Sequence, residues 1–82
     1  MTFEEWRATK RQVPVDHEDI QAYPFREETR ECLVYQGGLI IECCPGGGFI
    51  LQLPMEEERT DDLEALELRL YEFGLGEGSI QA

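Results

Sequence analysis

The stretch TDDLEALELRLYEFG, at residues 60–74, constrains the fold more than any other part of the chain. Its apolar residues recur at spacings of three and four: Leu63, Leu66, Leu70 and Phe73. This spacing is typical of a helix that packs one face against a core. Thr60 is a suitable N-cap residue, and Gly74 fits the left-handed residue that often follows a helix. We therefore predict a helix over about residues 61–73.

The segment before this helix predicts a three-stranded antiparallel meander, with strands at about residues 31–36, 39–44 and 48–53. Gly37 and Gly38 form a two-residue hairpin turn in which both residues can take positive φ. The glycine-rich stretch PGGG connects the second strand to the third. It lacks the helix and the lysine that follow a phosphate-binding loop, so a hairpin loop is the favoured interpretation.

The two-residue turn also predicts the strand register, in which Val34 pairs with Ile41 and Cys32 with Cys43. In the second hairpin, Cys43 pairs with Phe49. Because side chains alternate between the two faces of a sheet, one face is then almost wholly apolar: Cys32, Val34, Leu39, Ile41, Cys43, Phe49, Leu51 and Leu53. We expect the C-terminal helix to pack on this face. Unless the N-terminal helices cover it, the other face is a candidate docking or dimer surface through four apolar residues: Leu33, Tyr35, Ile40 and Ile50.

The N-terminal part of the chain predicts short helices. Thr2 and Glu5 have the spacing of a capping box at the start of a helix that reaches about Arg11. Residues 13–15 form an extended connector around a proline. Asp16 is placed to cap a second short helix.

Together these elements predict a single α+β domain over residues 1–82. An N-terminal helical segment at residues 1–30 precedes the core of meander and helix at residues 31–74. The glycine-rich residues 75–82 are expected to form a flexible tail.

The charge is unusual, since 18 acidic residues against 7 basic ones give a formal net charge of −11. Such a field attracts basic protein surfaces and repels nucleic acid and membranes, so we expect no direct binding to either. The sequence shows no apolar run long enough to span a bilayer and no signal peptide, which favours a cytoplasmic location. Three cysteines, an odd number, favour free thiols over a disulfide framework.

The sequence predicts a protein without enzymatic activity, cofactor or metal. It contains no arrangement of Ser, His and Asp or of Cys and His that indicates nucleophilic catalysis. His17 is the only histidine. Its acidic neighbours Asp16, Glu18 and Asp19 are adjacent in sequence and point in different directions, so they do not predict a metal site.

The best candidate for a functional surface is an acidic ridge along the linker and the C-terminal helix. The predicted partner-binding residues are Glu56, Glu57, Glu58, Asp61, Glu64, Glu67, Leu68, Tyr71 and Glu72. The ridge would mimic a polyanion and occupy the basic surface of a nucleic-acid-binding protein or a nucleoprotein effector complex. The alternative is a small accessory or structural interaction protein, as a homodimer or docking module, whose acidity serves only solubility.

The pattern YQGGLIIECCPGGGFILQLP followed by TDDLEALELRLYEFG resembles small acidic phage and mobile-element proteins of the anti-CRISPR type. The likeness is one of size, acidity and a plan of meander plus helix, and it assigns no site residues. It implies that the partner is a CRISPR effector complex, whose DNA-binding or RNA-binding channel is lined with lysine and arginine. It also implies that the protein acts in the cytoplasm of a bacterial host cell.

Overall fold

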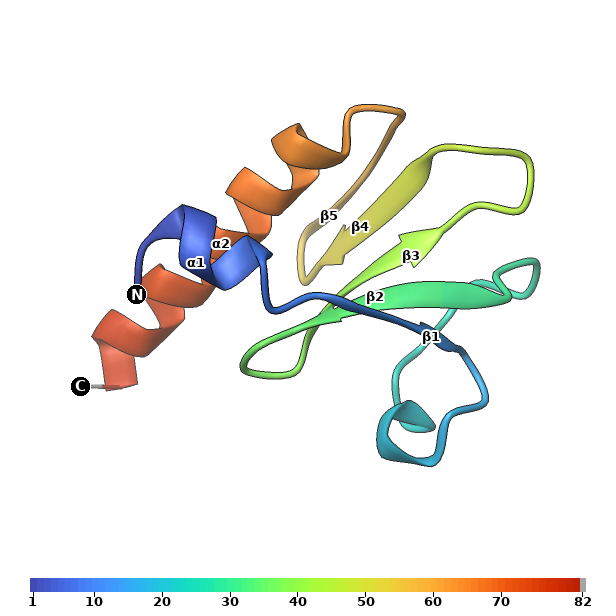
Figure 1. Cartoon of the computed structure of the whole chain (residues 1–82), viewed down its shortest axis with the longest axis horizontal. Coiled ribbons are helices and arrows are strands. Elements are labelled where there is room, and N and C mark those ends of the chain that lie inside the picture. The colour runs from blue at the N-terminus through green and yellow to red at the C-terminus, as the bar shows by residue number, and fades with distance from the viewer. Residues whose placement is uncertain (82) are drawn as a thin grey trace.

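The computed structural model of the chain describes the backbone of residues 1–81 and the side chains of residues 1–74. The fold is α+β, with a five-stranded antiparallel sheet in the order β1-β2-β3-β4-β5 and helices α1 and α2 together on one face (Figure 1). In chain order the elements are α1 (Phe3–Arg7), β1 (Arg11–Pro14), the 3₁₀ helix η1 (Glu18–Ile20), β2 (Glu31–Tyr35), β3 (Leu39–Cys43), β4 (Phe49–Leu53), β5 (Glu56–Thr60) and α2 (Leu63–Gln81). The α+β class is as predicted, but the three-stranded meander is wrong because the sheet has a further strand on each side.

Strand β1 adds the first edge of the sheet, where a helix end and a connector were predicted. The helix α1 ends at Arg7, and Arg11 then pairs with Val34 of β2 in antiparallel register. Pro14 closes the strand, a position that costs little because a proline on an edge strand breaks no central ladder. The N-terminal segment is therefore not purely helical.

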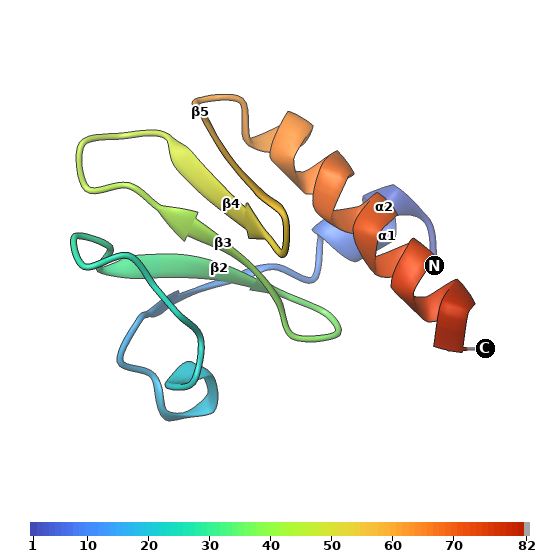
Figure 2. The same cartoon turned by 180° about the vertical axis from the view of Figure 1, so that it is seen from behind.

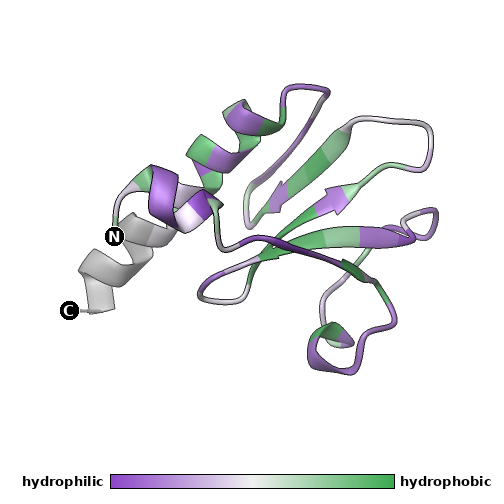
Figure 3. Cartoon of the chain, viewed as in Figure 1, coloured by the Kyte–Doolittle hydropathy of each residue, from purple (hydrophilic) through white to green (hydrophobic). Residues whose placement is uncertain are grey.

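Strand β5 adds the other edge, where residues 56–58 were predicted to be a linker. Its sequence EEERT pairs with β4, with Leu51 opposite Glu58 and Leu53 opposite Glu56. The strand has no alternation of apolar and polar residues. Its three glutamates instead form ion pairs with arginine side chains of the same molecule. Figure 3 shows β5 as hydrophilic, whereas the central strands β2 to β4 mix hydrophobic and hydrophilic segments. A charged edge of this kind discourages pairing with other sheets.

The register between β2 and β3 differs from the prediction by one residue. Tyr35 pairs with Leu39, so three residues, not two, make the turn; Gly37 and Gly38 take positive φ values of 93° and 78°. The shift moves every side chain of β2 to the opposite face. Leu33 and Tyr35 therefore face the helices. The register between β3 and β4 is confirmed, with Cys43 opposite Phe49.

The helices and one sheet face enclose an apolar core: Trp6, Leu33, Tyr35, Ile41, Leu51, Leu66 and Leu70. On α2 the buried positions Leu66 and Leu70 are as predicted, but Phe73 is 37 % exposed. Glu67 instead lies on the buried face of the helix, where its side chain is fully buried. The helix thus carries a carboxylate in the stripe that the sequence predicted to be apolar.

Both ends of α2 differ from the prediction. Asp62, not Thr60, caps the start, because its Oδ1 accepts a hydrogen bond from the Ala65 N–H at 3.2 Å. The helix continues past Gly74 to Gln81. A Cβ on Gly74 would lie 3.0 Å from Leu39 Cδ1, so this glycine permits close packing on β3 and does not end the helix. The side chains of the predicted tail, residues 75–82, lie outside the described residues.

The sheet face opposite α2 is partly covered by the segment between β1 and β2, as Figure 2 shows from behind. Ile40 and Ile50 are 6 % and 1 % exposed on this face. The predicted docking face of Leu33, Tyr35, Ile40 and Ile50 is therefore wrong, because two of its residues belong to the helix-side core and the other two are buried.

Candidate functional site

The predicted acidic ridge is largely paired with basic side chains of the same molecule. Glu56 and Glu58 lie on the side of β5 that faces α2, and the Arg69 guanidinium binds both carboxylates. This fork-shaped contact fits the planar guanidinium, which can donate to two acceptors at once. The two glutamates therefore join β5 to α2 and are not free anions.

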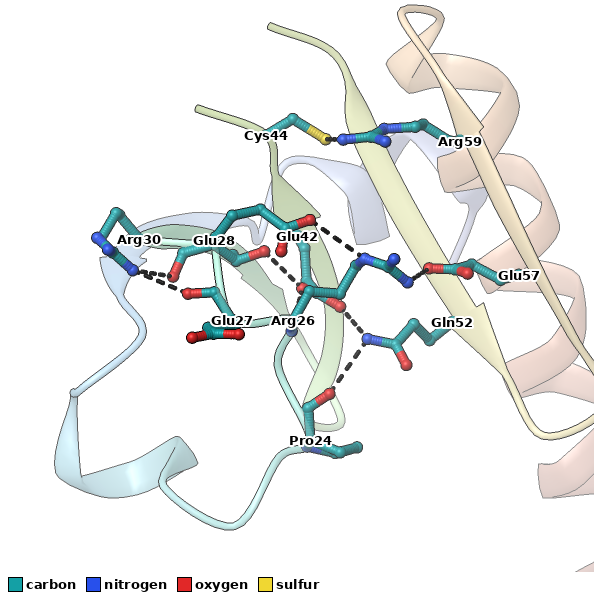
Figure 4. A network of polar contacts seen from close by, with 11 residues as sticks. Pro24, Arg26, Glu27, Glu28, Arg30, Glu42, Cys44, Gln52, Glu57 and Arg59 are labelled. Atoms are coloured by element: carbon teal, nitrogen blue, oxygen red, sulfur yellow. Dashed lines mark hydrogen bonds and ion pairs between the residues drawn. The ribbon is translucent and has the colours of Figure 1, made fainter. Parts of the chain in front are cut away.

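Glu57 points to the other side of β5, where it meets Arg26 from the segment before β2 (Figure 4). The same guanidinium lies 3.3 Å from Glu28 Oε1 through its Nε. A backbone hydrogen bond lowers the pKa of Glu28, and the contact with Arg26 lowers it further. Arg26 thus connects the segment between η1 and β2 to β5, and Glu57, like Glu56 and Glu58, has an arginine partner within the molecule.

Glu67 is the most strongly held residue of the predicted ridge. Its Oε2 accepts hydrogen bonds from Tyr35 Oη at 2.7 Å and from Lys10 Nζ at 2.9 Å. Arg7 Nη2 lies 2.8 Å from Oε1, and Arg7 Nη1 donates to Glu64 at 3.0 Å. Because a buried charge needs both a counter-charge and hydrogen bonds, this cluster makes Glu67 structural.

The Glu67 cluster fixes α1 against the sheet through aromatic packing as well. The Trp6 and Tyr35 rings stack with centroids 4.4 Å apart. Burial, together with the hydrogen bond to Glu67, raises the pKa of Tyr35, so the phenol stays protonated and donates. Tyr71, a predicted contact residue, packs 5.4 Å from the Phe3 ring and donates to the Met1 carbonyl oxygen at 2.6 Å.

Three predicted residues remain available on the surface: Asp61, Leu68 and Glu72. We call them the α2 outer surface. Leu68 is 45 % exposed, and no basic side chain in the described part of the chain lies within ion-pair distance of Asp61 or Glu72. Asp61 lies just before α2, whose residues rise about 1.5 Å each. A Cβ on Gly48 would lie 2.7 Å from Asp61 Oδ1, so the Asp61 carboxylate lies against the β3–β4 turn, whereas Leu68 and Glu72 are neighbours on one face of the helix.

A second buried carboxylate, Glu42 on β3, escaped the sequence prediction. It lies on the sheet face opposite α2, and its Oε1 accepts from the Arg26 backbone N–H at 3.0 Å and from the Thr29 hydroxyl at 2.8 Å. Gln52 donates to its Oε2 and to the Pro24 carbonyl (Figure 4). These donors are all neutral. The only signal in the sequence was a glutamate within the apolar run LIIECC.

Near Glu42, the Tyr23 hydroxyl and the Cys32 side chain are also buried. The Tyr23 hydroxyl has no hydrogen-bond partner among the described residues. Burial, reinforced by Glu42 and Cys32, raises the pKa of Tyr23 to about 12. Burial, reinforced by Cys43 and Glu42, raises the pKa of the Cys32 thiol to about 11. Both groups stay protonated near neutral pH.

A groove that the sequence did not predict opens beside β1. Its volume is about 500 Å³. Residues from β1, β2, η1 and the β2–β3 turn line it, among them Arg11, Val13, His17 and Val34.

The three cysteines are free thiols, as predicted. The observed register places Cys32 opposite Glu42, and Cys43 on the helix side of the sheet. Within the described residues no group of three or more His, Cys, Asp and Glu side chains gathers as it would around a metal ion. The same part of the chain contains no helix of sufficient length and apolarity to cross a membrane.

Comparisons with protein-family models, with curated proteins and with solved structures found no match for this chain.

Proposed function

We propose that the protein is a small, non-enzymatic, acidic inhibitor that occupies a basic nucleic-acid-binding surface of another protein or nucleoprotein complex. Its charge supports this proposal. The chain has a net charge of −11, and four of its seven basic side chains already hold carboxylates of the same molecule. The field outside the molecule is therefore negative, which accelerates association with surfaces rich in lysine and arginine.

The α2 outer surface is the contact region that the geometry favours. Asp61 and Glu72 have no internal cation to compete with a partner's lysine or arginine, unlike Glu56 and Glu58 beside Arg69. Leu68 supplies an apolar contact beside Glu72, and desolvation at its side chain would strengthen the neighbouring charge pair.

A CRISPR effector complex, acting in a bacterial cytoplasm, is one partner with the required basic channel. Because the recognised feature is a channel lined with basic side chains, other nucleoprotein complexes with such a channel would be captured in the same experiment. The alternative function as a docking module would need another surface, because Leu33, Tyr35, Ile40 and Ile50 are buried.

The test is affinity capture from a bacterial lysate with the full chain as bait, at low and at high salt. We expect a nucleic-acid-binding protein or nucleoprotein at low salt and its loss at high salt, because screening weakens exposed charge pairs. The bait Asp61→Lys with Glu72→Lys should lose this partner. The control bait Asp16→Lys with Glu18→Lys reverses two exposed carboxylates by the same charge at η1, away from α2, and should retain it.

Thermal unfolding of both variants confirms that each is folded before capture. If the two baits recover the same protein equally well, the α2 outer surface is not the contact. Capture that does not depend on salt, or of a partner without a basic surface, contradicts the proposal as a whole.

A further inference from the structure

The groove beside β1 has a floor formed by the edge of the sheet. Arg11 pairs with Val34 and Val13 with Cys32, so these side chains share the face opposite α2. Ile20 of η1 forms part of the wall, and Thr9 and the turn at Gly37–Gly38 lie at the other end. With about 500 Å³, the groove has the size of a site that holds a few side chains.

The backbone beside this groove is open for pairing. β1 is an edge strand, and apart from its ladder with β2 no backbone hydrogen bond reaches residues 11–13 within the described part of the chain. An edge strand with free N–H and C=O groups can accept a further strand from another chain.

The two edges of the sheet differ in their charge, and therefore in how readily a further strand could pair with them. On β5 three consecutive glutamates are tied to Arg69 and Arg26, which crowds the edge with charged side chains. On β1 the residues Arg11, Gln12 and Val13 include no carboxylate. The fold therefore blunts one edge and leaves the other accessible.

The groove also contains unsatisfied donors. Arg11 is exposed and has no carboxylate partner among the described residues, whereas Arg7 and Lys10 next to it are bound to Glu67. His17 Nδ1 accepts a hydrogen bond from the Asp19 N–H at 3.2 Å, which assigns the proton of the neutral ring to Nε2 and leaves that N–H as a donor. Asp19 is the one carboxylate of the lining and lies beside His17, 3.7 Å from its Nδ1. Charge complementarity therefore places an incoming carboxylate at the Arg11 end.

We infer that the groove beside β1 binds an extended peptide segment of a partner protein, added as a strand to the edge of the sheet. A carboxylate of the segment pairs with Arg11. A branched apolar side chain two positions away packs on Val13, Val34 and Ile20, because side chains on one face of a strand recur every second residue. This site is separate from the α2 outer surface and does not rest on the proposed function.

The test is selection of random dodecapeptides displayed on phage against the immobilised full chain. We expect enriched sequences with an acidic residue two positions from valine, isoleucine or leucine. The most enriched peptide is then synthesised, and its affinity is measured by fluorescence anisotropy. Its binding to the isotope-labelled protein should shift the amide NMR signals of Gln12, Val13 and Val34.

Two variants make the result decisive. Arg11→Glu should weaken the selected peptide by about tenfold or more, as expected for reversal of a charge pair at a peptide contact. Arg30→Glu makes the same change at an exposed arginine outside the groove lining and should leave affinity unchanged. Equal binding to the Arg11→Glu protein, the absence of any enriched sequence, or NMR shifts confined to other strands would overturn the inference. So would a protein dimer that forms through β1 and is abolished by Arg11→Glu, since it would assign the groove to a second copy.

Discussion

Glu67 and Glu42 are both fully buried glutamates, yet they lie on opposite faces of the same sheet and are stabilised in different ways. Glu67 meets two cations and a phenol, from Arg7, Lys10 and Tyr35. Glu42 meets a backbone N–H, a hydroxyl and an amide, and no basic side chain of the described residues forms an ion pair with it.

The difference shows where this acidic chain places its few cations. On the helix side, Arg7 and Lys10 bring α1 and the start of the sheet onto α2 through one carboxylate. On the opposite side, Glu42 fixes the loop between η1 and β2 with neutral donors. Four of the seven basic side chains bind carboxylates that join elements of the fold, and carboxylates such as Glu72 keep no internal cation among the described residues.

The largest expected effect comes from replacing each glutamate with glutamine. Glu67→Gln should lower the free energy of unfolding by about 3 kcal/mol, since it leaves Lys10 without a carboxylate and Arg7 with Glu64 alone in a partly buried site. Glu42→Gln should cost less, about 2 kcal/mol, because the amide oxygen can keep the Arg26 and Thr29 donors and no ion pair is lost, although the Gln52 amide loses its acceptor. Urea unfolding of the two variants measures both values.

The same two substitutions can contradict the claimed difference between the two carboxylates. Equal losses would mean that the cations at Glu67 contribute no more than neutral donors do. A larger loss for Glu42→Gln would mean that the network on the opposite face is the stronger of the two.

A smaller effect is expected at Tyr23, which lies beside Glu42. Its hydroxyl is buried without a partner, so Tyr23→Phe should change stability at neutral pH by less than about 1 kcal/mol, and in the stabilising direction. The pKa of Tyr23 is raised from 10.0 to about 12 in the folded protein. The unfolded state therefore loses this proton first, and the native protein loses stability as the pH rises from about 10 to 12.

Urea unfolding as a function of pH tests this prediction. Tyr23→Phe should flatten the loss of stability in the alkaline range without changing the profile below about pH 9. An unchanged alkaline profile would show that Tyr23 does not contribute to it.

Much of the fold could be predicted because its signals are local. The capping box of Thr2 and Glu5, the strands β2 to β4 and the leucine spacing of α2 are all present as expected. The edge strands were missed because neither has apolar alternation. The register of β2 was missed because Gly37 and Gly38 fit a two-residue and a three-residue turn equally well, and a slip of one residue exchanges the faces.

The candidate site was less predictable, since it depends on contacts distant in sequence. The sequence assigned Glu67 to the acidic ridge and did not indicate that Arg7, Lys10 and Tyr35 would converge on it. The ion pairs of Arg69 with Glu56 and Glu58 require β5, a strand that the sequence did not indicate. Sequence reasoning therefore found the acidic residues and could not separate the paired ones from the free ones.

The most direct test of this separation is the affinity for the captured partner as a function of salt, measured for two neutralised variants. Asp61→Asn with Glu72→Gln and Glu56→Gln with Glu58→Gln change the net charge equally. We predict that the first variant binds more weakly and with a shallower salt dependence, whereas the second binds nearly as the unaltered chain does. An equal or larger loss for the second variant would contradict the account, because it would show that the glutamates bound to Arg69 contact the partner.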